Sequence, residues 1–540
     1  MLGIKLDNLR GDLFGGLTAG VVALPLALAF GEASGAGPIA GLYGAIIVGF
    51  FAALFGGTGS QISGPTGPMI VVFAGVFGAL SGNPGLVFAT VVLAGVIQVA
   101  FGIFKLGQYI KLVPYPVVSG FMTGIGCIII ALQASRLFGH EPEGSGTIPA
   151  LTAIPGAVLD PNWVALGLGL LTLIIVFTWP AKMAKIVPPP LAALVIGTLL
   201  STIIAGAPLL GDIPTGLPSF VIPEFRADTI VIVFEAAFVL ALLGSLDSLL
   251  TSLVADNMTR TKHNSNQELI GQGIGNVFAG FFGGIPGAGA TMRTVVNIRT
   301  GGLTKISGMI HSVLLFAVVV SLGPLAAQIP HAVLAGILVK VGYDIVDLAY
   351  LKRAHKGPRW DLLLMVLVLT LTVFVDLITA VIAGVVLASL AFVKQMADLQ
   401  LESIKNLEEG IYQLAPSEEE EILKDVADSI TLFDFNGPLS FGAAADLGHH
   451  VRLKAKGSSA LVIDFLQVPF LDVSAARAVA TICQDATEAK KRIFISGMNS
   501  KVKQVLIALQ EDSVVPEMFY ENRKDALEAT RKFILAAQKN

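Results

Sequence analysis

The sequence predicts an α-helical membrane protein of about fourteen spanning segments, followed by a small soluble α/β domain. Three observations lead to this fold class. Hydrophobic residues make up 54% of the 540 residues and charged residues only 14%, whereas a soluble domain usually carries about 25% charge. Long apolar runs recur along most of the chain, and the composition changes near Lys394.

The spanning segments follow from the length rule that a membrane helix needs roughly 20 mainly apolar residues. Most of the segments are regular, and three are Gly-rich or interrupted. The regular segments are expected to begin near Phe14, Ile39, Gly85, Val117, Trp163, Pro188, Ile230, Thr304, Ala332, Leu362 and Ile378, and the irregular ones near Ile62, Ile270 and Ala288.

Loop charge supports an even number of segments with both termini in the cytoplasm. In that topology the inner loops hold nearly all Lys and Arg residues of the membrane region, and the outer loops hold only Arg136 and Arg226. Positive charge accumulates on the cytoplasmic side of membrane proteins. One missed segment would invert half of this pattern.

Composition divides the chain into a transmembrane domain at 1–393, a charged linker at 394–428 and a cytoplasmic domain at 429–540. The linker contains an acidic run at 417–421. Strand and helix patterns alternate in the last part, which is typical of a small sheet covered by helices. The expected strands are SITLFDF, SALVIDF and RIFISG, and the expected helices are AAADLGHHVRLKAK, VSAARAVATICQDATEAK and SKVKQVLIALQED.

Several functional classes have no support in the sequence. The net charge of −4 gives no reason to expect a nucleic-acid partner. Cys127 and Cys483 lie far apart, so neither a disulfide framework nor a thiolate metal site is expected. There is no Walker motif for ATP-driven transport. No nucleophile–base arrangement indicates an enzyme, and no cofactor is expected.

Two interrupted segments, SGPTGPMIVV at 63–72 and PGAGATMRTV at 286–295, resemble each other. Each is the third of seven in its half of the membrane domain, and matching broken segments indicate a transporter binding site. A half-helix that begins within the membrane has unpaired N–H groups and a positive dipole end, which suit an anion. We therefore expect an anion pocket between two facing half-helices. The alternative is that the glycines only permit close helix packing.

Asp247 lies in the apolar segment FVLALLGSLDSLLTSLVAD, where a carboxylate is costly and indicates function by default. Thr251 follows one helical turn later and shares its face. With free carbonyl oxygens, the two side chains suit a small hard cation. Protonation of Asp247 or a purely structural hydrogen bond are the alternatives. Arg293 either offsets anion charge or pairs with a carboxylate to hold helices together.

These motifs resemble the SulP anion transporter family. The resemblance is carried by LPLALAF at 24–30, GLYG at 41–44, SGPTGP at 63–68 and a C-terminal region similar to a STAS domain. More narrowly, the chain is similar to the BicA-type sodium-dependent bicarbonate transporters of cyanobacteria. That similarity is carried by GSLDSLLT at 244–251, NQELIGQGIGN at 266–276 and PGAGATMRTVVN at 286–297.

The resemblance implies two inverted repeats of seven segments, arranged as a core and a gate domain. It also implies a homodimer with a STAS contribution, in a bacterial plasma (inner) membrane. Matching motifs imply that bicarbonate contacts Thr66, Ala290 and Thr291, with Phe30 lining the site and Arg293 as a secondary candidate. They imply that sodium is held by Asp247, Thr251, Gly289, Ala290 and Thr291.

The C-terminal stretch DFLQVPFLDVS at 464–474 is similar to the strand and turn that carry a phosphorylatable serine in anti-sigma-factor antagonists. The order Asp472-Val-Ser-Ala475 departs from their usual Asp-Ser-Ser-Gly pattern. We therefore expect an unmodified Ser474 that caps the following helix, in a domain that serves dimerisation and regulation.

Together these expectations describe sodium-coupled import of bicarbonate by an elevator-type motion. Sodium would neutralise Asp247, and each ion would raise the affinity for the other. One alternative is a proton-coupled sulfate or dicarboxylate transporter of the same family, in which Asp247 titrates. Alternatives from other classes are an anion channel and a membrane sensor with the STAS domain as its output.

Overall fold

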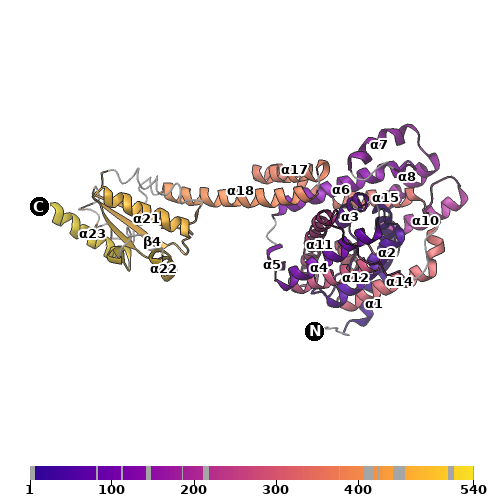
Figure 1. The fold of residues 1–540 in the computed structure, drawn as a ribbon, viewed down its shortest axis with the longest axis horizontal. Helices are drawn as coiled ribbons and strands as arrows, with labels where there is room; N and C mark the ends of the chain where they lie inside the picture. The colour runs from indigo at the N-terminus through magenta and orange to yellow at the C-terminus, as the bar shows by residue number, and fades with distance from the viewer. Residues whose placement is uncertain are drawn as a thin grey trace. The chain divides into compact units, whose positions relative to one another are not determined.

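The computed structural model contains two units, Met1–Val386 and Leu387–Asn540 (Figure 1). It describes residues 7–538 apart from 81–82, 111–113, 142–146, 185–186, 211–217, 376, 407–418, 420, 423–425, 427–428, 442–456 and 509–515. The predicted helix at 443–456 and most of the acidic run at 417–421 lie outside the described residues. The predicted domain limits at 393 and 428 stay predictions.

Helices dominate the first unit, and most begin within a few residues of a predicted segment start. They are α1 (Leu9–Ala33), α2 (Pro38–Phe55), α3 (Gly67–Ala79), α4 (Pro84–Ile103), α5 (Gly107–Ile110), α6 (Tyr115–Leu137), α7 (Thr147–Leu159), α8 (Trp163–Thr178), α9 (Ala181–Ala184), α10 (Pro189–Ile203), α11 (Ile230–Thr259), α12 (Ser265–Phe281), α13 (Thr291–Arg299), α14 (Lys305–Ala326), α15 (His331–Ile345), α16 (Leu348–Leu351) and α17 (Arg359–Phe374). Helix α18 (Leu377–Asn406) begins in the first unit and continues into the second. Two short strands, β1 (Ser63–Gly64) and β2 (Ala288–Gly289), lie among them.

Length and composition qualify six helices within the described residues to cross a membrane. A seventh span results if α7 and α8, which meet at a bend of 115°, cross together. Shorter apolar helices include α3, α10 and part of α14. The mainly helical class is confirmed, and the number fourteen stays a prediction.

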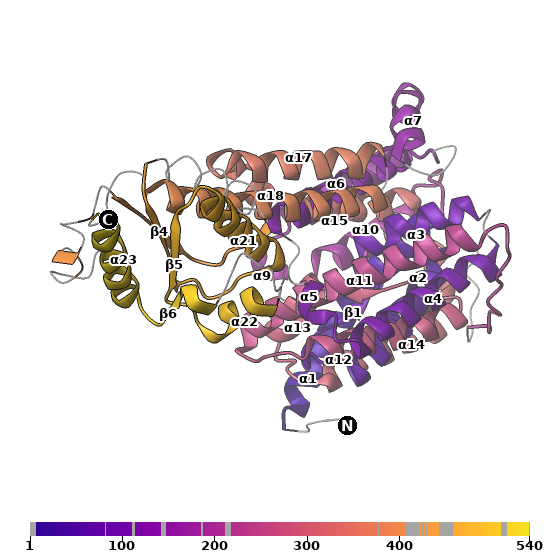
Figure 2. The same ribbon diagram turned by 60° about the vertical axis from the view of Figure 1, so that its left-hand side comes forward.

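The helices of the first unit form two bundles, which we name after the predicted domains. In the core bundle, α1 to α4 pack with α11 to α14; α12 lies on both α2 and α4, and α14 lies on α1 and α2. In the gate bundle, α6 lies beside α15 and α17 (Figure 2). Helix α8 contacts both α10 and α15. Each bundle therefore combines helices from both halves of the membrane sequence.

Helix α12 is continuous although its sequence is Gly-rich, because its glycines permit close packing rather than a break in the helix. A Cβ atom on Gly273 would lie 2.5 Å from the carbonyl oxygen of Gly95, and one on Gly95 would lie 2.6 Å from that of Gly273. The backbones of α12 and α4 are thus in direct contact, as small residues permit in membrane proteins. For this segment, which was expected to be Gly-rich or broken, the glycines serve packing.

The second unit contains a parallel sheet in the order β3 (Ile430–Asn436), β4 (Ala460–Gln467), β5 (Arg492–Ser496) and β6 (Phe519–Tyr520). Helices α21 (Val473–Glu488) and α22 (Ser500–Ala508) cover one face, and α23 (Arg523–Gln538) covers the other (Figure 2). The three predicted strands are confirmed. The sequence reading missed β6, which has only two residues, and α23.

Successive strand residues point to opposite faces and build two separate cores. Phe433, Phe435 and Ile463 pack beneath α21 and α22, whereas Leu432 and Val462 pack against α23. This double burial explains why β3 and β4 are almost continuously apolar.

An arginine anchors α23 to the sheet. Arg523 pairs with Glu419 at 2.9 Å and Asp434 at 3.0 Å, and its Nη1 lies 3.6 Å from Asp464. Burial, together with the neighbouring Asp464 carboxylate, raises the pKa of Asp434. The cationic side chain thus offsets three acidic groups whose mutual repulsion would otherwise oppose folding.

The expected role of Ser474 is wrong, because Asp472 is the N-cap of α21. One carboxylate oxygen of Asp472 accepts a hydrogen bond from the N–H of Ala475 at 2.8 Å, and the other accepts one from the N–H of Phe441, also at 2.8 Å. Ser474 lies one residue inside the helix. A carboxylate both caps the first turn and interacts favourably with the helix dipole.

Replacing this cap should loosen the start of α21. Asp472→Ala is expected to lower the free energy of opening the first turn by about 1 kcal/mol, which corresponds to roughly fivefold faster amide exchange. Hydrogen–deuterium exchange of the full chain measures this at Ala475 and Ala476. Asp472→Asn keeps a capping oxygen and should exchange like the wild type; equal acceleration in both variants would contradict the capping role.

Cys483 should be unreactive in the folded protein. Burial raises the pKa of its thiol to about 12, and only the thiolate is a nucleophile. At pH 8, iodoacetamide should therefore modify Cys483 roughly a hundredfold more slowly in the folded than in the denatured chain. Peptide mass spectrometry resolves the peptide of Cys483 from that of Cys127. Equal rates in both states would show that the thiol is accessible.

Candidate functional site

The two interrupted segments cross in the core bundle. Strands β1 and β2 pair antiparallel, with Ser63 opposite Gly289 and Gly64 opposite Ala288. Helix α3 follows β1 and α13 follows β2. Because the strands run in opposite directions, the two helices leave the crossing in opposite directions. Their N-termini therefore face each other, as the sequence predicted.

Both half-helices begin without a side-chain cap. Thr66 is the N-cap residue of α3 and Ala290 that of α13, and neither end has a side-chain capping hydrogen bond. The Thr66 hydroxyl is buried beside the Asp247 carboxylate, yet it makes no hydrogen bond of normal geometry to a described residue. Unpaired N–H groups and an unused hydroxyl are donors that suit an anion.

Helix α11 supplies oxygen atoms beside this crossing. Thr251 Oγ1 lies 3.0 Å from the carbonyl oxygen of Gly289, to which it can donate, and 2.7 Å from Thr291 Oγ1. The carboxylate of Asp247 lies beside Thr66, and its Oδ2 atom is buried without a hydrogen-bond partner in the described part of the chain. A buried carboxylate oxygen without a donor indicates a place for a cation or a proton.

Two small cavities border the site. Asp247 and Pro68 line one of them, together with apolar side chains of α6 and α11 such as Phe121 and Leu243. Phe30 lines the other, beside Gly67 at the start of α3 and Gln133 of α6. Phe30 is thus next to the start of α3, and both cavities lie where the core and gate bundles meet.

The side chain of Arg293 contacts the backbone of the first broken segment. The side chain is 2% exposed, and its Nη2 atom donates to the carbonyl oxygen of Pro65 at 2.5 Å. A Cβ atom on Gly64, whose φ is +149°, would lie 2.8 Å from Arg293 Nη1. One alternative from the sequence was that Arg293 pairs with a carboxylate. Its hydrogen bond goes instead to a backbone carbonyl, and Asp247 is close enough for an electrostatic interaction. The guanidinium therefore connects the two halves of the crossing.

The sequence reading missed a polar network on α12 that supports the crossing. Glu268 is 1% exposed and accepts hydrogen bonds from the N–H groups of Gly57 and Thr58, both at 2.9 Å. It also accepts from the amides of Gln61 at 2.8 Å and Gln272 at 2.9 Å. Four donors thus compensate the buried charge.

Asn276 extends this network to β2. Its side-chain amide donates to the carbonyl oxygen of Gly287 at 2.9 Å and accepts from the N–H of Gly287 at 2.8 Å. Gln272 likewise donates to Ser63 Oγ at 2.6 Å. Polar residues Glu268, Gln272 and Asn276 recur every four positions, which places them on one helix face. That spacing was the signal in the sequence that could have found them.

The comparisons with known proteins agree with this architecture. Residues 9–368 match the sulfate permease family, and residues 421–526 match the STAS domain. The fold and the paired half-helices define a multi-pass membrane transporter, and the chain belongs to the sulfate permease (SulP) family. The predicted resemblance is confirmed.

Individual relatives share most of their length with the chain. It is 45% identical to the bicarbonate transporter BicA of a Synechocystis species, covering 97% of this chain and 94% of that protein. It is 34% identical to the putative sulfate transporter YvdB of Bacillus subtilis, covering 93% of this chain and 94% of that protein.

Solved structures agree on the fold. The transmembrane domain of a cyanobacterium bicarbonate transporter BicA matches with a TM-score of 0.67 and 51% identity, over 70% of this chain and 98% of that chain. The structure of SLC26A9 matches with a TM-score of 0.81 over 99% of this chain and 92% of that chain. Its 18% identity supports the fold alone.

The structure places the predicted ligand residues around one crossing, and their roles stay predictions. Those expected to contact the anion or sodium lie on the two half-helix starts and on α11: Thr66, Asp247, Thr251, Gly289, Ala290 and Thr291. Phe30 borders this group, and Arg293 braces it from within α13.

Ser248 should be required for a stable crossing. Its hydroxyl accepts from the N–H of Gly289 at 2.9 Å and donates to the carbonyl oxygen of Gly244 at 2.5 Å. Ser248→Ala leaves the buried N–H of Gly289 without that acceptor, which should lower the free energy of unfolding by about 1–3 kcal/mol. Thermal melting of the purified protein measures this loss.

A matched control lies one turn earlier on α11. Within the described part of the chain, the buried Ser245 hydroxyl donates only to the carbonyl oxygen of Ala241 in its own helix, at 2.6 Å. Ser245→Ala should therefore melt within about 1 kcal/mol of the wild type. Equal destabilisation by the two substitutions would mean that Ser248 has no special role at the crossing.

Proposed function

We propose that this chain imports bicarbonate together with sodium across the plasma (inner) membrane of a bacterium. The observation that carries the proposal is the meeting of two uncapped half-helix N-termini beside an aspartate whose Oδ2 atom has no donor among the described residues. The dipole ends and the hydroxyl of Thr66 provide for an anion. Asp247 provides for the cation that balances it.

Sodium is the cation that the available donors favour. Asp247, the hydroxyls of Thr251 and Thr291, and the backbone oxygen of Gly289 offer only oxygen atoms, with the two hydroxyls 2.7 Å apart. Ions that prefer nitrogen or sulfur ligands are disfavoured there. Neutralising Asp247 removes the charge that would repel an anion next to Ala290.

Bicarbonate is the anion that the similarity to the BicA transporters suggests and that the pocket suits. The hydroxyl of Thr66 can donate to a small oxyanion, and the cavities beside the site are small and mostly apolar. Sulfate is the second candidate, because the Bacillus subtilis relative is named a putative sulfate transporter. In that case protonation of Asp247 would replace sodium binding.

Movement of the core bundle against the gate bundle would give alternating access. Both cavities lie between the bundles, so a shift of one bundle changes which side of the membrane reaches the crossing. We further propose that both termini are cytoplasmic and that the chain forms a homodimer to which the STAS domain contributes.

Uptake by the reconstituted protein tests coupling and selectivity together. Labelled bicarbonate should accumulate in proteoliposomes with an inward sodium gradient and much less without one. Sulfate, chloride and fumarate should compete weakly. Equal uptake with and without the gradient would reject sodium coupling, and uptake driven by external acid with strong sulfate competition would establish the second candidate.

Asp247→Asn should lower uptake in the presence of sodium to the level measured without it. The amide keeps the shape of the side chain but removes the charge that attracts the cation. Glu235→Gln is the matched control, because Glu235 is an exposed carboxylate on the same helix. It should leave the sodium dependence unchanged, and sodium-stimulated uptake by the Asp247→Asn variant would show that the cation binds elsewhere.

A further inference from the structure

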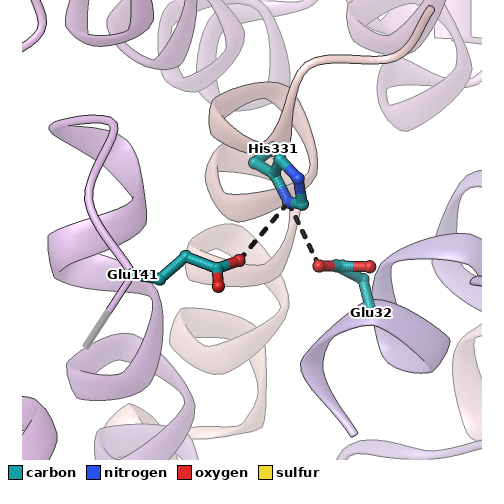
Figure 3. Close-up of side chains that lie close together, drawn as sticks. All are labelled: Glu32, Glu141 and His331. Carbon is teal, nitrogen blue, oxygen red and sulfur yellow. Dashed lines mark ion pairs between the residues drawn. The ribbon is translucent and has the colours of Figure 1, made fainter. Parts of the chain in front are cut away.

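Three ligand-type side chains converge at a second place, away from the crossing (Figure 3). Glu32 lies in the last turn of α1, Glu141 follows α6, and His331 is the first residue of α15. The His331 Nδ1 atom is 3.1 Å from Glu32 Oε1 and 4.0 Å from Glu141 Oε1. The three ligand atoms all lie within 4.8 Å of one another.

The other ring nitrogen fixes what Nδ1 can do. His331 Nε2 lies 3.1 Å from the carbonyl oxygen of Leu209. A carbonyl oxygen only accepts, so Nε2 carries a proton, and Nδ1 of the neutral ring presents a lone pair to the two carboxylates. Glu32 Oε1 is at hydrogen-bond distance, yet Nδ1 makes no hydrogen bond of normal geometry to a described residue. Acceptors that face each other in this way need either a proton or a metal ion between them.

We propose that Glu32, Glu141 and His331 bind an exchangeable divalent cation of the zinc class. A separation of 3.1 Å suits neighbouring ligands of a metal with bonds of about 2.0–2.2 Å. The Glu141 side chain is 66% exposed and can rotate to close its longer gap. A metal-bound histidine usually donates its second N–H to a carbonyl or carboxylate oxygen, which is the role that Leu209 has here.

Ligand chemistry and the surrounding charge set the expected selectivity. An imidazole nitrogen favours zinc-class ions over magnesium and calcium, which prefer oxygen ligands. The guanidinium of Arg136, in the last turn of α6, also acts electrostatically on Glu32 and His331. Because this positive charge opposes a cation, the ion should exchange readily and bind only when it is supplied.

The bound ion would connect the two bundles. Glu32 belongs to the core bundle, whereas His331 and the segment after α6 belong to the gate bundle. In the predicted topology this end faces the outside. An ion held there resists separation of the bundles and so slows transport; this consequence, unlike the binding itself, rests on the proposed function.

Zinc binding by the full-length protein, purified with an affinity tag free of histidine, tests the site. Competition with a fluorescent zinc chelator should show one site per chain that magnesium does not occupy. His331→Asn and Glu141→Gln should each weaken it at least tenfold, in keeping with the roughly 10–100-fold losses seen even for groups that only support a ligand. Glu141 is exposed, so its substitution leaves the fold intact.

His355→Ala is the control and should bind zinc like the wild type. His355 lies outside both bundles, in the turn at Ala354–Lys356. Absence of saturable binding, or equal binding by the wild type and both variants, would overturn the proposal and leave a protonated His331 paired with Glu32. External zinc should also slow uptake by the wild type but not by the Glu141→Gln variant. If zinc binds but uptake is unchanged, the inference that the bound ion holds the two bundles together and slows transport is wrong.

Discussion

The structure of the membrane unit depends on the pairing of β1 with β2. Two helices are broken inside an apolar environment, where unpaired backbone groups are costly. The two broken segments form backbone hydrogen bonds with each other. Side chains bond further backbone groups: Asn276 at Gly287, Ser248 at Gly289 and Arg293 at Pro65. The N-terminal groups of the half-helices are thereby left for a ligand. The same pairing holds the two halves of the membrane sequence together, because β1 lies at residues 63–64 and β2 at residues 288–289.

Much of this architecture could be predicted from the sequence because its signals are local. The length of the apolar runs indicates the spanning helices, and interruption by Pro and Gly indicates the broken ones. Asp247 stands out because burying a carboxylate in an apolar segment is costly and therefore points to a function. The supporting groups are a different case. Glu268 binds Gln61, and Arg293 binds the carbonyl of Pro65, both over more than two hundred residues. A backbone carbonyl leaves no trace in the sequence, so the partner of Arg293 could not be predicted.

The second unit shows the same division between local and distant information. Its strands could be predicted because both faces of β3 and β4 are covered, which makes them continuously apolar. The start of α21 at Val473 matches the predicted helix, but its capping residue could not be predicted, because Asp472 and Ser474 are both good capping residues and only the fold selects between them. Helix α23 is amphipathic and polar on one side, and its attachment through Arg523 to acidic residues far earlier in the chain has no local pattern.

The contact between Gly64 and Arg293 constrains how the family can diverge. A side chain at position 64 would strike the guanidinium, and a non-glycine residue would also be strained at that φ. A larger residue can be accepted there only if position 293 becomes smaller and the backbone of the first broken segment changes. Loss of the arginine alone would therefore not make room for a side chain at position 64, because the backbone conformation there still favours glycine.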